Sequence, residues 1–81
     1  MTKLQKEIFN NKYNEITTEI DNLKGLIKTL EKQRDEAIDE QCIFVSRNIQ
    51  EQINDYQKQL DKLIYCRSVL KNLYNQIAME L

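Results

Sequence analysis

Proline, histidine and tryptophan are absent from this chain of 81 residues, and glycine occurs once. The sequence therefore contains almost no residue that ends a helix or forms a tight turn. Charged residues make up 31% of the chain and hydrophobic residues 41%, which is typical of long helices rather than of sheets or disordered segments. This composition predicts an all-α protein with a single domain.

The absence of histidine also limits the chemistry that this chain could perform. Histidine is the usual general base near neutral pH and the commonest ligand of transition metals. Ser46 and Ser68 have no base partner in the sequence, and one glycine cannot form a glycine-rich phosphate loop. We expect a protein that is not an enzyme, with no catalytic residue, no metal and no cofactor.

Long hydrophobic runs are missing as well. The longest, Cys42 to Val45 and Leu63 to Cys66, hold four residues each, far fewer than the roughly 18 that cross a bilayer. The first residues carry charge and amide groups, so no secretory signal is readable. Cys42 and Cys66 match no zinc or redox motif, and their apolar neighbours suggest reduced cysteines used in packing. The alternative is a disulfide between two chains related by symmetry. We expect a cytoplasmic protein without a membrane segment.

Two ladders of mainly apolar residues are the dominant feature. Their members recur in steps of four and three, the seven-residue repeat with which helices pack on helices. The first ladder is Phe9, Tyr13, Ile16, Ile20, Leu23, Ile27 and Leu30, and the second is Ile49, Ile53, Tyr56, Leu60, Leu63, Arg67, Leu70, Tyr74, Ile77 and Leu81. We expect Ile16, Ile20, Leu23, Ile27, Leu60, Leu63, Arg67 and Leu70 to form the seam at which helices associate.

The segment between the ladders predicts an antiparallel helical hairpin. Thr2 and Gln5 have the spacing of a capping box, so a first helix is expected over about residues 3–42. The run from Cys42 to Val45 covers most of the way round a helix and cannot all face one seam. We therefore predict a turn at about residues 43–47 and a second helix over about 48–80, capped by Asn48 or Ser46. Leu30 would then lie level with Leu60, and Ile16 near Tyr74.

Two other arrangements fit the same sequence. From Ile27 to Leu60 the apolar spacing approaches an eleven-residue repeat, so a single long helix in a coiled-coil oligomer is allowed. Such a rod would be about 120 Å long. A break near Gly25, giving three helices, is also possible.

Several apolar residues lie beside the ladders and would stay in water on an isolated hairpin. They include Ile64, Val69 and Leu73 on the second helix and Ile43 and Phe44 at the expected turn. We predict that these five residues bind protein: a second copy, giving a homodimeric four-helix bundle, and one larger protein. The chain would then be a small adaptor, assembly factor or inhibitor, of a size and composition that suit an accessory protein of a phage or mobile element.

Charge supplies an alternative function and a constraint on association. Lys24, Lys28 and Lys32 form a basic stripe that could bind nucleic acid, although a net charge of −1 makes a nucleic-acid partner the weaker prediction. Residues 31–61 hold eight acidic and four basic residues, whereas the rest hold five acidic and eight basic. This asymmetry favours antiparallel association of two hairpins, or a basic partner at the turn.

Arg67 is a charged residue on an otherwise apolar ladder. One interpretation is a buried partner across the hairpin, either Glu19 or Asp21, that fixes the register of the helices. The other is that its aliphatic stem packs in the seam while the guanidinium reaches water.

Overall fold

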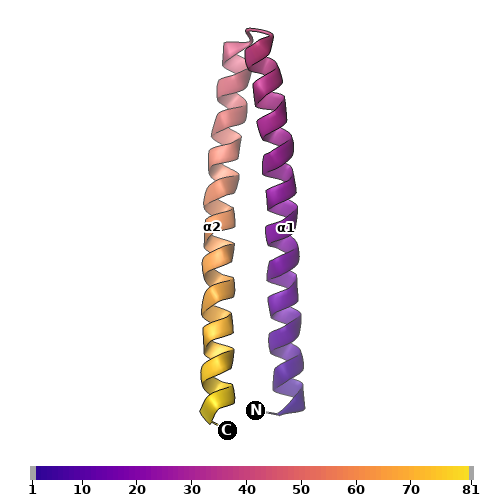
Figure 1. The fold of residues 1–81 in the computed structure, drawn as a ribbon, viewed down its shortest axis with the longest axis vertical. Coiled ribbons are helices and arrows are strands. Elements are labelled where there is room, and N and C mark those ends of the chain that lie inside the picture. The colour runs from indigo at the N-terminus through magenta and orange to yellow at the C-terminus, as the bar shows by residue number, and fades with distance from the viewer. Residues whose placement is uncertain (1, 81) are drawn as a thin grey trace.

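The computed structural model describes residues 2–80, with side chains to residue 78, and it contains two long helices. Helix α1 spans Lys3–Asp39 and helix α2 spans Ile43–Glu80. They run antiparallel as one hairpin with the two chain ends together (Figure 1). The hairpin measures 60 × 15 × 12 Å, half the length of the single rod, so the continuous helix is wrong. The predicted hairpin fold is confirmed.

Helix α1 begins where the sequence predicts. The backbone N–H of Thr2 donates to Oε1 of Gln5 at 2.9 Å, and the backbone N–H of Gln5 donates to Oγ1 of Thr2 at 3.2 Å. This reciprocal pair satisfies two N–H groups that a helix start otherwise leaves without partners. The helix continues through Gly25, where a Cβ would meet nothing within 4 Å. The three-helix alternative is therefore wrong.

The turn lies at residues 40–42, earlier than the predicted 43–47. Gln41 adopts the left-handed conformation with φ 61°. Its N–H donates to the carbonyl of Ile38 at 3.0 Å, and the N–H of Cys42 donates to the carbonyl of Ala37 at 2.8 Å. These two bonds form a Schellman motif, which closes the end of α1 without the glycine usually found at that position.

Helix α2 accordingly starts at Ile43, five residues before the predicted start. The first bond of the helix runs from the N–H of Ser46 to the carbonyl of Cys42 at 3.0 Å. Ser46 does not cap the helix, because its hydroxyl donates to the carbonyl of Ile43 at 2.7 Å. Asn48 lies inside the second turn of the helix, so both predicted caps are wrong.

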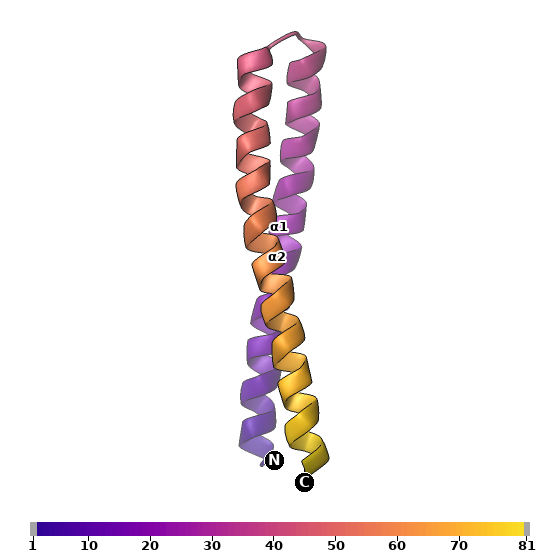
Figure 2. The same ribbon diagram turned by 90° about the vertical axis from the view of Figure 1, so that its left-hand side faces the viewer.

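The two ladders face each other and form a narrow core. The buried members come from both helices: Ile16, Ile20, Ile27 and Leu30 of α1, and Ile53 and Leu60 of α2. Ala37 of α1, beyond the ladder, is also buried. Leu23, Ile49, Tyr56, Leu63 and Leu70 pack against them while partly exposed. Figure 2 shows α2 crossing in front of α1 at a shallow angle near mid-length, as expected for helices that pack through a seven-residue repeat.

The register of the helices differs from the prediction by one heptad. Tyr74, expected near Ile16, instead meets Phe9, with ring centroids 5.5 Å apart. Near the turn, Nη1 of Arg34 donates to Oε1 of Gln50 at 2.7 Å. Moving the turn shifts the pairing by seven residues, which leaves every ladder residue on the seam because the repeat is also seven. Leu30 is thus level with the region of Ile53 rather than with Leu60.

Neither described helix contains a stretch both long enough and apolar enough to pass through a membrane.

Candidate protein-binding surfaces

Exposed apolar side chains gather at the turn of the hairpin and along the half that carries the chain ends. At the turn they are Ile38, Ile43, Phe44 and Val45, here called the tip surface. From mid-length to the chain ends they are Leu4, Ile8, Ile64, Tyr65, Val69 and Leu73, here called the open-end surface. Between these two surfaces the only large apolar side chain described as exposed is Leu26. The outside of the hairpin between the two surfaces is otherwise polar.

The tip surface includes both residues predicted there. Ile43 and Phe44 belong to the first turn of α2 rather than to the connecting turn, and they are 60% and 81% exposed. A side chain this open to water contributes little to the core of its own hairpin. These two side chains therefore do not close the end of the hairpin's own core.

The open-end surface contains an apolar groove along one side of α2. Its walls are formed by Tyr65, Cys66, Val69, Leu70 and Leu73 of α2 with Lys12 and Ile16 of α1, and it encloses about 270 Å³. The predicted residues Val69 and Leu73 are thus brought together. Ile64, 38% exposed, is outside this groove and lies nearer the opposite flank of α2.

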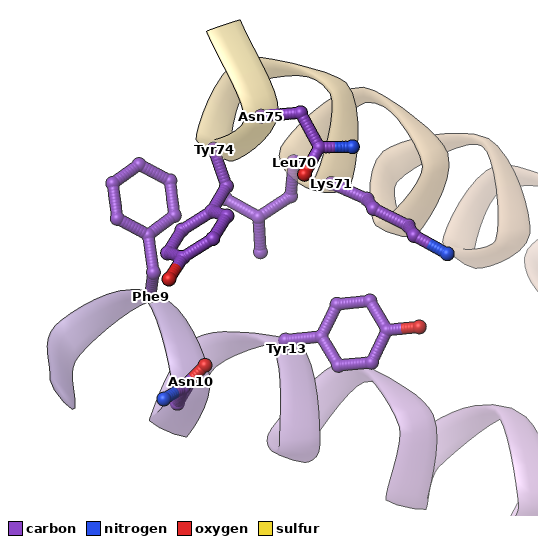
Figure 3. Close-up of a pocket in the computed structure, with 7 residues that line it drawn as sticks. All are labelled: Phe9, Asn10, Tyr13, Leu70, Lys71, Tyr74 and Asn75. Atoms are coloured by element: carbon purple, nitrogen blue, oxygen red, sulfur yellow. The ribbon is translucent and has the colours of Figure 1, made fainter. Parts of the chain in front are cut away.

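A second hollow, of about 220 Å³, lies on the other side of the open end (Figure 3). It is lined by Phe9, Asn10 and Tyr13 of α1 and by Leu70, Lys71, Tyr74 and Asn75 of α2. The rings of Phe9 and Tyr74 pack edge to face at an interplanar angle of 73°. This hollow was not predicted. The only signal for it is that aromatic rings replace Ile and Leu at ladder positions, and larger rings fill a two-helix seam less evenly.

The eight predicted seam residues all lie between α1 and α2. Ile16, Ile20, Ile27 and Leu60 are buried there, and Leu23, Leu63, Arg67 and Leu70 are half-buried. The seam therefore holds the hairpin together rather than presenting a surface to a second chain. Any partner must use the flanks of the helices.

Arg67 does not have the predicted carboxylate partner. Its Nη1 lies 3.5 Å from Oγ1 of Thr17, a contact at the long limit for a hydrogen bond. Among the described side chains the ion pairs are Lys12 with Glu15 and Arg34 with Asp35, so neither Glu19 nor Asp21 pairs with it. The half-exposed position of Arg67 agrees with a packed stem and a guanidinium that reaches water.

The cysteines differ from the prediction, because Cys42 and Cys66 are both exposed free thiols rather than packing residues. Within the described residues, no group of three or more His, Cys, Asp or Glu side chains is placed to hold a metal ion. Lys24, Lys28 and Lys32 are all exposed on α1.

Comparisons of this chain with protein-family models, with curated proteins and with solved structures give no match.

Proposed function

We propose that this chain is a non-enzymatic protein-binding module. It self-associates into a four-helix arrangement and binds one larger protein as an adaptor, assembly factor or inhibitor. The observation that carries the proposal is the concentration of exposed apolar side chains in the tip and open-end surfaces, with a largely polar outside between them.

The physical argument is the cost of leaving these side chains in water. Complete burial of a Leu, Ile, Val or Phe side chain stabilises a protein by about 1.5 to 3 kcal/mol. Two helices that face each other bury only their seam, and seven of the described hydrophobic residues are buried here. Covering the two surfaces with another polypeptide therefore provides a large favourable contribution that the hairpin alone lacks.

Charge favours a protein over a nucleic acid as that partner. The chain carries a net charge of −1. The exposed Lys24, Lys28 and Lys32 could attract a nucleic acid, but the overall charge of the protein would not add to that attraction. Nucleic-acid binding through this stripe would weaken steeply with added salt and disappear when all three lysines are replaced by glutamate. Binding through the apolar surfaces would instead change little with salt.

We place the module in the cytoplasm. Two exposed thiols persist most readily in a reducing compartment, and the described helices include no membrane-crossing stretch.

Affinity capture with matched variants tests the binding of a larger protein. The bait is the full chain, as wild type, as Ile43→Ala and as the control Arg47→Ala, which removes an exposed polar side chain from the next helical turn. We expect a protein captured by wild type and by Arg47→Ala to be lost with Ile43→Ala. Equal recovery of that protein by all three baits would contradict a binding role for the tip surface.

A further inference from the structure

Two rows of residues run along the outside of α2, on either side of the row that contains Asp55, and each repeats every seven residues. The first row is Phe44, Glu51, Lys58 and Tyr65, and the second is Val45, Gln52, Gln59 and Cys66. All eight residues are exposed. In a helix packed through a seven-residue repeat, residues seven apart keep the same orientation relative to the seam, so each row stays on one side of α2.

Each row can pair with the same row of a second helix that runs in the opposite direction. The first begins and ends with an aromatic residue, and its two central residues carry opposite charges. The second begins and ends with a small apolar residue and has two glutamines between them. When two such helices lie antiparallel, Phe44 meets Tyr65 of the second copy, Glu51 meets Lys58 of the second copy, and Val45 meets Cys66 of the second copy.

The charges select the antiparallel orientation. A parallel pair would place Glu51 beside Glu51 and Lys58 beside Lys58 of the second copy, and like charges repel. The distribution along the whole hairpin acts in the same direction, since acidic residues predominate over residues 31–61 and basic residues over the remainder. Antiparallel overlap brings the acidic tip of one copy towards the basic open end of the other.

We propose that the outer face of α2 is covered by α2 of a second copy, antiparallel, about an axis near Asp55. Both copies use the same residues on the two sides of this two-fold axis, so the contact gives a symmetric dimer to which no third copy can add in the same way. The rows from Phe44 to Cys66 give a contact about 33 Å long. Phe44 and Val45 of the tip surface of each copy then pack on the apolar groove of the other.

This arrangement rests on the proposed function, because it names one partner of the surfaces described above. It covers Phe44, Val45 and the groove but leaves Ile38, Ile43 and Ile64, which lie towards the other flank of α2 or on α1, for the larger protein. One residue opposes the dimer. Asp55 of each copy lies near the axis, where the two carboxylates repel.

Disulfide cross-linking of the full chain tests the orientation. In a Cys42→Ser/Val45→Cys variant, the thiols at positions 45 and 66 lie about 32 Å apart on one helix, so they cannot bridge within one chain. Mild oxidation with diamide should link two copies through position 45 of one and Cys66 of the other. Two control variants each keep one of these thiols: Cys42→Ser, and Cys42→Ser/Val45→Cys/Cys66→Ser.

We expect the two controls to remain unlinked when oxidised separately and to link when mixed. Efficient linkage of Cys42→Ser alone would place Cys66 beside Cys66 of the second copy and overturn the antiparallel arrangement. Failure of the Cys42→Ser/Val45→Cys variant to link would overturn it as well.

Charge exchange provides an independent test by sedimentation. Glu51→Lys should raise the dimer dissociation constant about tenfold, because it creates two like-charged contacts in the symmetric pair. Glu51→Lys/Lys58→Glu should restore the wild-type value, and Asp55→Asn should lower it. All three positions are exposed, so helix content by circular dichroism should not change. A double variant no tighter than Glu51→Lys, or an Asp55→Asn variant with unchanged affinity, would contradict the proposed pairing.

The two proposals fail separately. A chain that is monomeric but captures a larger protein through Ile43 overturns the dimer and leaves the binding function intact. A cross-linked antiparallel dimer whose capture of any larger protein is unaffected by Ile43→Ala overturns the tip as a binding site and leaves the dimer intact.

Discussion

The ring of Phe9 packs edge to face against the ring of Tyr74, with centroids 5.5 Å apart, although the two residues lie near opposite ends of the sequence. This contact is at the open end of the hairpin, far from the turn. It therefore reports the register of the whole structure. If the two helices paired one heptad away, Tyr74 would lie beside Ile16 instead.

A double-mutant cycle at Phe9 and Tyr74 measures this register. We expect Phe9→Leu and Tyr74→Leu to show a coupling energy of about 0.5 to 1.5 kcal/mol in urea denaturation, the range of an aromatic pair. The matched cycle of Ile16→Val with Tyr74→Leu should show coupling near zero. Coupling in the second cycle but not in the first would mean that the helices pair one heptad away.

A substitution at Gln41 tests the position of the turn. Its φ of 61° is unfavourable for a residue with a Cβ. Gln41→Gly should therefore raise the free energy of unfolding by about 1 kcal/mol. Glu40, with φ −82°, is the control, and Glu40→Gly should not stabilise the protein. If Glu40→Gly stabilises the hairpin and Gln41→Gly does not, the turn lies elsewhere.

The turn also shows what this sequence could and could not predict. The steps of four and three identified every described ladder residue correctly, because burial between two helices demands that spacing. The same repeat gives equal burial in registers seven residues apart, so it could not choose between Phe9 and Ile16 as the neighbour of Tyr74. The register is determined by which residues form the turn.

Turn chemistry is hard to read here because no glycine or proline marks the turn. The apolar run from Cys42 to Val45 suggested a turn, yet Ile43 and Phe44 are helical and exposed. Their apolar character therefore did not mark the turn. The capping box of Thr2 and Gln5 was predictable because its two hydrogen bonds need only a local sequence match.

Core and flank residues should differ sharply in their effect on stability. Ile20 is completely buried, whereas Leu26 is 40% exposed. We expect Ile20→Ala to cost about 2 to 5 kcal/mol, and Leu26→Ala less than about 1 kcal/mol. If Ile20→Ala unfolds the chain, Ile20→Val should cost about 0.5 to 1.5 kcal/mol. Equal costs for Ile20→Ala and Leu26→Ala at one protein concentration would contradict the seam.

The polar contact between Arg34 and Gln50 stabilises the hairpin near the turn. Nη1 of Arg34 donates to Oε1 of Gln50 at 2.7 Å, and Nε2 of Gln50 donates to Oδ1 of Asn54 at 2.9 Å. Both residues are partly exposed, so we expect a coupling energy of about 0.5 to 1.5 kcal/mol between Arg34→Ala and Gln50→Ala. Arg34→Ala with Asn54→Ala is the control cycle and should couple more weakly. If the effects of Arg34→Ala and Gln50→Ala on the free energy of unfolding are independent, the hydrogen bond does not stabilise the hairpin in solution.

Sedimentation equilibrium of the purified full chain tests most directly whether the outer face of α2 is an interface. We predict a mass twice the 9.7 kDa of one chain, and a return to one chain in a Phe44→Ser/Val69→Ser variant that keeps its helix content. A wild-type mass of one chain at concentrations up to about 1 mM, where even contacts worth about 4 kcal/mol are half occupied, would contradict the account.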